Sequence, residues 1–161
     1  MYPKRYVPKA LSSSDKKLQK NEISKSKRQY KKNEYYTRRK VESFKSRESK
    51  HIINAKEIYK IKKVNLSKEL SRRTGCSRKV LSEIMRKGQG AYYSSGSRPN
   101  QTAHSWGKAR LASAITGGKA AALEYNLLKK GCKKTSKALR LAEKAKKVHK
   151  SGTRRVPKTL K

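Results

Sequence analysis

Residues 66–87, LSKELSRRTGCSRKVLSEIMRK, contain the local signals that decide the fold. Ser67 and Ser77 can each cap a helix, and Gly75 can supply the positive φ that a tight turn requires. The second helix is expected to stop at Gly88, because glycine commonly terminates helices. This stretch therefore predicts two short helices that meet at a steep angle, over residues 67–73 and 77–87.

The spacing within this stretch is that of a helix-turn-helix. Small Ser71 stands where the helices approach, and three apolar side chains are expected to face inward: Leu70, Leu81 and Ile84. In DNA-binding versions, the start of the second helix contacts base edges or phosphates and the first helix contacts the DNA backbone. The residues in those positions are Arg78 and Lys79, with Arg72 and Arg73. A two-helix corner is also a common packing element in small helical domains, so DNA binding and packing are both open.

Helical spacing of apolar residues predicts four more helices around this corner, over residues 53–63, 103–116, 119–130 and 136–149. Candidate core residues on them are Trp106, Leu111, Ile115, Leu123 and Leu127. The last of these helices is amphipathic and basic. Its Lys146 and Lys147 suit a neighbouring protein, an anionic membrane surface or nucleic acid, and the pattern does not choose among the three.

Residues 88–102, GQGAYYSSGSRPNQT, predict a long ordered loop. Backbone amides of its glycines, its serine hydroxyls and Arg98 are candidates for holding a phosphate or a carboxylate, and Thr102 can cap the next helix. The alternative is a loop that only locks the domain together.

The first 50 residues predict an extended basic arm, because prolines interrupt their start and the remainder is charged on every face. Tyr30, Tyr35 and Tyr36 lie among lysines and arginines, of which Arg38 and Arg39 are candidate contacts for nucleic acid or an acidic partner. Such tyrosines suit base stacking, and they suit packing on a protein neighbour equally well.

Charge dominates the composition: among 161 residues, 46 Lys and Arg stand against 10 Asp and Glu, giving a formal net charge of +36. Most soluble enzymes do not have such an excess of positive charge. It indicates that the partner is a polyanion or an acidic protein surface. The chain is expected to be all-α, a small helical domain with a helix-turn-helix-like corner and long basic extensions. The expected divisions are an arm (1–50), the helical domain (51–131), and a basic amphipathic helix and tail (132–161).

Chemistry-bearing residues are sparse. Cys76 and Cys132 fall in different predicted segments, and a lone pair is no disulfide framework, which indicates a reducing, intracellular place of synthesis. The three histidines are scattered, and the glutamates at helical positions beside Lys or Arg suit surface ion pairs. We therefore expect no enzyme, no metal and no cofactor. With no apolar run of spanning length and no apolar signal core at the start, neither a membrane span nor export by the general route is expected.

Three further motifs carry a family resemblance: Arg86-Lys87-Gly88-x-Gly90-Ala91-Tyr92, then Ser95-Gly96-Ser97-Arg98-Pro99, then Trp106-x-x-Ala109-Arg110-x-x-Ser113-x-x-Thr116-x-Gly118-Lys119. With the two-helix unit, they resemble an uncharacterised domain family of large double-stranded DNA viruses of algae and protists and of tailed phages. The resemblance covers roughly Val64–Gly131. Phage versions tend to have His at Ser97 and Gly at Asn100, and this departure argues against carrying over a site in the loop.

The resemblance implies no activity and no catalytic residue, but it does imply a viral, particle-associated context. The location is then the virion, after synthesis in the host cytoplasm. The first hypothesis is a basic minor capsid protein whose arms tie capsid components together or meet an internal membrane. The second is a sequence-independent DNA-binding or packaging protein. The third is a ribosomal-type RNA-binding protein. None of them requires a small-molecule substrate.

Overall fold

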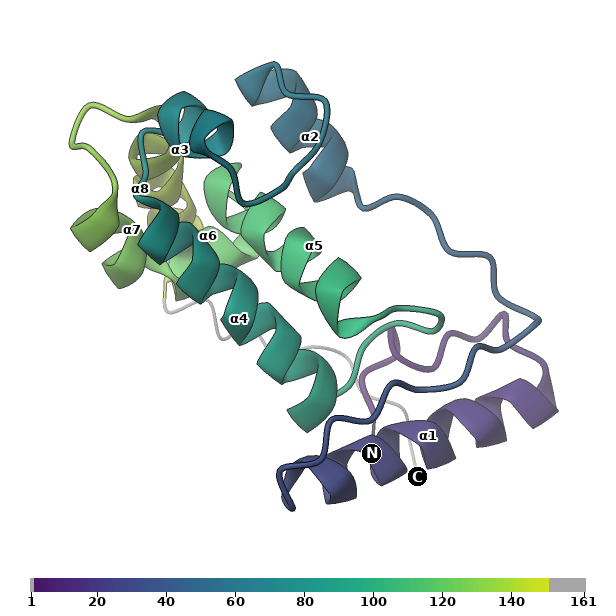
Figure 1. Ribbon diagram of the computed structural model, residues 1–161. Helices are drawn as coiled ribbons and strands as arrows, with labels where there is room; N and C mark the ends of the chain where they lie inside the picture. Colours follow the sequence, from purple (N-terminus) through teal and green to yellow (C-terminus); the bar gives the residue numbers. More distant parts are fainter. Residues whose placement is uncertain (1, 151–161) are drawn as a thin grey trace. The chain divides into compact units, whose positions relative to one another are not determined.

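The computed structural model describes residues 2–150. Within them the protein is all-α, as expected: eight helices hold 60% of these residues, and no strand occurs there. Figure 1 labels the helices. In chain order they are α1 (Ser13–Tyr30), α2 (Lys50–Tyr59), α3 (Lys68–Thr74), α4 (Arg78–Ser94), α5 (Ala103–Ile115), α6 (Lys119–Leu123), α7 (Tyr125–Gly131) and α8 (Lys137–His149).

The predicted corner between α3 and α4 is confirmed in its local detail. The Ser67 hydroxyl accepts a hydrogen bond from the Leu70 N–H at 3.1 Å, and the Ser77 hydroxyl accepts one from the Val80 N–H at 3.3 Å. Gly75 has a φ of 73° in the turn, the left-handed region that glycine enters without a steric penalty. Capping and glycine geometry thus place the turn where the sequence predicts it.

Helix α4 does not stop at Gly88, and this prediction was wrong. The helix continues to Ser94, so that the loop begins only at Ser95. A Cβ atom added to Gly88 would lie 2.8 Å from the Cα of Gly107, closer than real Cβ contacts come. Gly88 is therefore a close-approach residue between α4 and α5, a role that sequence alone cannot distinguish from a helix stop.

The chain forms two compact units. Unit 1 contains residues 2–47 and Gln89–Trp106, and unit 2 contains Glu48–Gly88 and residues 107–150. Each unit has its own cluster of buried apolar side chains. The expected boundary after residue 50 nearly coincides with the first boundary between the units, but residues 89–106 belong with the N-terminal segment.

The extended arm was a wrong prediction for residues 13–30, which form α1 in unit 1. The Ser12 hydroxyl caps this helix by accepting from the Asp15 N–H at 3.2 Å. One face is buried, with Ile23 inaccessible to solvent. The helix packs in a cluster whose buried members are Tyr6, Val7, Leu11, Ile23 and Val41, with Trp106 partly buried against them. Dense surface charge conceals this narrow apolar stripe in the sequence.

Unit 2 holds the larger core. Of the predicted core residues, Leu70, Leu81, Ile84, Leu111 and Ile115 are buried in it, and Leu127 is half-buried against it. Leu123 is 41% exposed, which corrects its assignment to the core. A break at Glu124 divides the expected single helix into α6 and α7, so Leu123 is the last residue of α6. Figure 1 shows α8 packed against both.

Glu124 itself is buried rather than part of a helix-surface ion pair. Its carboxylate is only 2% exposed and accepts hydrogen bonds from Arg110 and from Lys87, the latter at 3.0 Å. A buried carboxylate requires such partners, because removal from water is otherwise costly. The two cations come from α5 and α4, so the ion pairs link those helices to the α6–α7 break.

Cys76 and Cys132 form a disulfide, contrary to the expectation from their spacing. Both residues are buried, and 56 positions separate them in the chain. The bond joins the turn before α4 to the segment between α7 and α8. Sequence distance carries no information about this proximity, which arises from the packing of α7 and α8 against the corner.

Candidate anion-binding surface

The four basic residues predicted around the helix-turn-helix are all exposed. Arg72 and Arg73 lie in the last turn of α3, and Arg78 and Lys79 lie in the first turn of α4. The intervening turn contains only residues 75–77, so the two pairs lie on either side of it. The structure therefore brings together the residues that a DNA-binding corner would use.

The chain segment between α7 and α8 lies beside this turn and contributes two more cations. The Ser77 N–H donates to the Gly131 carbonyl at 2.8 Å, and the Lys133 N–H donates to the Gly75 carbonyl at 2.9 Å. Lys133 and its neighbour Lys134 are exposed. We define the corner cluster as Arg72, Arg73, Arg78, Lys79, Lys133 and Lys134.

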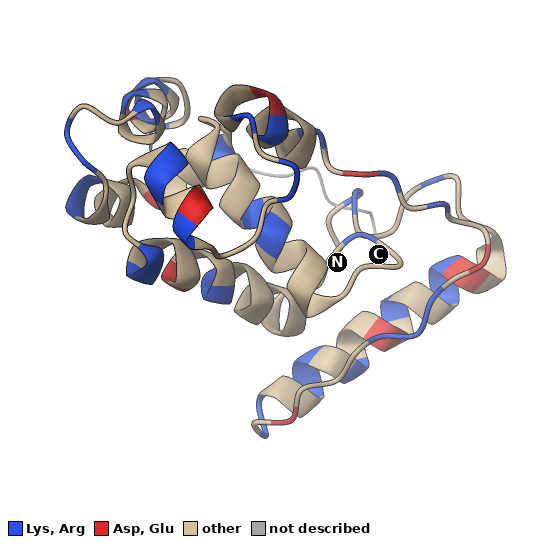
Figure 2. Cartoon of the chain, turned by 45° about the horizontal axis from the view of Figure 1, so that its top comes forward, with Lys and Arg blue, Asp and Glu red and all other residues tan. Residues whose placement is uncertain are grey.

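Sequence reasoning missed Lys133 and Lys134 because they are distant in the chain from the corner. The Cys76–Cys132 disulfide and the two backbone hydrogen bonds create the proximity. None of the ion pairs found within residues 2–150 uses a residue of the corner cluster. Figure 2 shows lysines and arginines spread over helices and connecting segments, with acidic residues much rarer.

Electrostatics at the start of α4 are unusual for an isolated protein. The first turn of this 17-residue helix contains Arg78 and Lys79 and no acidic residue. The positive end of the helix dipole lies there, so cations are disfavoured and an anion is favoured, typically by 0.3–1 kcal/mol per charge. A bound anion would remove this repulsion and would also lie near the backbone N–H groups at the start of the helix.

Arg38 does not belong to any exposed surface, which corrects its assignment as a partner contact. It is 7% exposed, and its guanidinium donates to the Tyr92 carbonyl at 2.7 Å and to the Ser97 hydroxyl at 2.6 Å. It also lies over the Tyr92 ring, 3.7 Å from the centroid. Burial lowers the pKa of the Arg38 guanidinium. Arg38 therefore holds unit 1 together.

Arg39, in contrast, has an exposed side chain that pairs with the buried Glu22 at 3.2 Å. Burial alone would raise the pKa of Glu22, but hydrogen bonds from the Arg39 backbone and side chain and from the Tyr36 hydroxyl outweigh it, so the pKa is lowered. The carboxylate is thus kept ionised inside unit 1. Arg39 remains accessible at its outer side, with 70% of its side chain exposed.

The loop between α4 and α5 is built from internal contacts. Ser97 is buried against Arg38, and the Asn100 side chain bonds the backbone of Val41 and Phe44. Thr102 caps α5 as predicted, accepting from the Ser105 N–H at 3.1 Å. Arg98 is exposed, but Ser97 is not available beside it as a ligand. These contacts favour the alternative of a loop that locks the fold.

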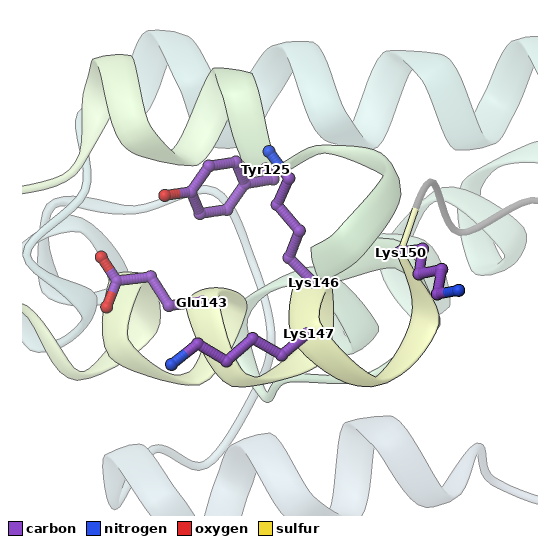
Figure 3. A pocket seen from close by; sticks show the side chains of 5 residues that line it. All are labelled: Tyr125, Glu143, Lys146, Lys147 and Lys150. Atoms are coloured by element: carbon purple, nitrogen blue, oxygen red, sulfur yellow. The ribbon is translucent and has the colours of Figure 1, made fainter.

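Lys146 and Lys147, the predicted contacts on α8, are exposed and line a shallow pocket with Tyr125, Glu143 and Lys150. Figure 3 shows Lys146 reaching toward Tyr125, whereas Lys150 points away from the ring. The Lys146 ammonium lies 4.2 Å from the ring centroid. This part of α8 is basic and open. The remainder of the predicted C-terminal tail, residues 151–161, lies outside the described residues.

Within residues 2–150, every helix is too short or too polar to span a bilayer. No group of three or more His, Cys, Asp or Glu side chains there has the arrangement of a metal site.

The comparison with protein families gives one match, a family of unknown function (DUF5824), over residues 3–130. The chain belongs to this family. The matched region includes α1 and the helix-turn-helix corner and ends before Cys132 and α8. Residues 3–47 are thus part of the family's domain, consistent with their folding into unit 1. Comparisons with curated proteins and with solved structures found no match.

Proposed function

We propose that this protein is a non-enzymatic nucleic-acid-binding protein that holds double-stranded nucleic acid at the corner cluster, largely independently of sequence. The observation that carries the proposal is the pair of cations, Arg78 and Lys79, on the first turn of α4, exposed and without an acidic neighbour in that turn. A phosphate at this position would meet two cations, backbone N–H groups and the positive end of the helix dipole together.

Charge supports a polyanion as the partner. With a net charge of +36, a protein in isolation repels itself, and each phosphate contact releases counterions from nucleic acid and so adds to affinity. Contacts of this kind do not depend on base sequence. The corner cluster gives this general attraction a defined place on the protein. Its six cations lie around one turn because α3, α4 and the α7–α8 segment pack together there.

Reversing the charge at the corner tests this proposal. We expect Arg78→Glu together with Lys79→Glu to weaken binding to a DNA duplex at least ten-fold at moderate salt, because two phosphate contacts become repulsions. The slope of log affinity against log salt should fall by about 2, since each contact contributes close to 0.9. Fluorescence anisotropy over a salt series measures both quantities.

The matched control is Lys146→Glu with Lys147→Glu on α8, which changes the net charge by the same amount at exposed positions. We expect a much smaller loss of duplex affinity from this pair. Equal losses from the two double variants would mean that binding follows total charge alone, and the corner cluster would then have no special role.

The resemblance to a family of large DNA viruses and tailed phages supports a second candidate, a minor capsid or other internal virion protein. The sequence alone predicts that such a protein uses a basic arm over residues 1–50 to tie subunits together. Because residues 13–30 are folded into unit 1, the contacts that join capsid subunits would instead come from exposed basic residues on the folded surface. Other capsid proteins or an anionic membrane surface would then be the partners.

Nuclease treatment of gently opened particles separates the two candidates. If the protein binds packaged nucleic acid, we expect it to be released in step with digestion, as followed by mass spectrometry of the sedimented and soluble fractions. Retention with the shell after complete digestion would instead assign it to the capsid and contradict the nucleic-acid proposal.

A further inference from the structure

Unit 1 contains a cluster of three tyrosine rings that are in contact with one another and are not fully buried. Tyr30 at the end of α1 and Tyr93 near the end of α4 are stacked, with centroids 6.0 Å apart and planes 11° apart. Tyr35 meets both rings edge-on, at 6.0 Å from Tyr30 and 5.2 Å from Tyr93. We call these three residues the tyrosine platform.

The outer ring of the platform is strongly exposed. Tyr35 is 70% exposed, whereas Tyr92, whose ring meets that of Tyr93 edge-on, is fully buried. Tyr30 and Tyr93 are half-buried behind it. An aromatic ring held in water by other rings presents apolar area that a partner could cover.

The backbone before Tyr35 is held in place rather than left to sample many positions. The N–H groups of Lys32 and Glu34 both donate to the Gln29 carbonyl, at 2.8 and 3.0 Å. Asn33 takes a left-handed conformation in this turn, with a φ of 62°. The backbone turn and the two ring contacts thus restrict Tyr35, which reduces the entropy lost when a partner binds.

Charge around the platform restricts the kind of partner. Lys31 and Lys32 directly follow Tyr30 and are exposed, and Lys40 is exposed further along the same segment. The acidic residue within this turn is Glu34, so cations outnumber acids locally. A partner that offers both flat π faces and negative charge is a single-stranded nucleic acid, whose unpaired bases are free to stack and whose phosphates are negatively charged.

We propose that the tyrosine platform is a base-stacking site for single-stranded nucleic acid, with Tyr35 as the ring that an unpaired base covers. Tyr30 and Tyr93 support that ring from behind, and Lys31 and Lys32 meet the adjoining phosphates. This site goes beyond the duplex-binding function proposed for the corner cluster and rests on different residues in a different unit.

The test compares two strands of equal length and charge, an oligothymidylate and an abasic strand with the same phosphates. We expect the wild-type protein to bind the oligothymidylate about ten-fold more tightly, because stacking of one base on one ring contributes on that scale. Tyr35→Leu should abolish this preference, whereas Tyr35→Phe should keep it, because phenylalanine retains the π face and leucine retains only apolar bulk.

Several outcomes would overturn the proposal. Equal wild-type affinity for the two strands would exclude stacking, and a base preference that survives Tyr35→Leu would exclude Tyr35. An equal loss of affinity for both strands in Tyr35→Leu would leave the base preference intact and would assign the loss to folding rather than to stacking, which circular dichroism of the variant would identify. The Arg78→Glu, Lys79→Glu variant should keep its base preference while losing duplex affinity, so failure of either proposal is recognised separately.

Discussion

Replacing Cys76 and Cys132 together with alanine is expected to lower the free energy of unfolding by about 4 kcal/mol. The disulfide closes a long loop, since 56 positions separate the two cysteines. In the chain-entropy description, a loop of this length restricts the unfolded chain by that amount. The loss falls on unit 2, because both cysteines belong to it.

Reduction of the wild-type protein provides the matched measurement. The urea midpoint of unit 2, followed by far-ultraviolet circular dichroism, should fall on adding reductant to nearly the value of the double variant. The double variant itself should not respond to reductant. Two free thiols titrated in the unreduced, unfolded protein, or a midpoint insensitive to reductant, would contradict a disulfide at this position.

A functional consequence accompanies this loss of stability. The disulfide holds the α7–α8 segment, with Lys133 and Lys134, against the turn of the corner. Without the bond, the two remaining backbone hydrogen bonds retain that segment less firmly. The contribution of Lys133 and Lys134 to duplex affinity should therefore decrease in the double variant.

The second large effect is expected at Arg38. Arg38→Leu should destabilise unit 1 by about 3 kcal/mol, because hydrogen bonds from a charged donor each contribute about 1.5–3 kcal/mol and their buried acceptors lose a partner. The acceptors are the Tyr92 carbonyl and the hydroxyls of Ser26 and Ser97. Relief of the desolvated charge offsets part of the loss, which keeps the total below the sum of the separate bonds.

Trp106 is the natural reporter for this variant, since it is the chain's single tryptophan and packs on the cluster of unit 1. Thermal unfolding followed by its fluorescence should show a clearly lower midpoint for Arg38→Leu. The control Lys40→Leu removes the same charge from an exposed position and should change the midpoint little. Equal midpoints for the two variants would contradict a structural role for Arg38 and would support its prediction as an exposed partner contact.

Local signals in the sequence predicted local structure well. The caps at Ser67, Ser77 and Thr102 and the turn at Gly75 involve residues that lie within a few positions of one another. These hydrogen bonds do not depend on where distant segments of the chain lie, so the local sequence is enough to predict them. The all-α class follows from the same kind of information.

The predictions from the sequence were wrong where a residue distant in the chain determines the local structure or the burial of a side chain. Gly88 lies within α4 at a close approach to Gly107, where a side chain would not fit. Residues 13–30 become helical against apolar side chains that precede and follow them. Arg38 is a cation in a basic segment, which predicts a surface contact, but its side chain is buried. Burial of a cation depends on acceptors in other segments, and the sequence around it does not record them.

By itself, then, the sequence determined the charge, the helical class, the caps and the exposed cations on either side of Gly75. The tertiary structure alone decided that the N-terminal segment folds into unit 1, that Cys76 meets Cys132, and which cations gather at the corner. The physical reason is range: hydrogen bonds within a helical turn join neighbours in the chain, whereas burial and disulfide pairing join residues that only folding brings together.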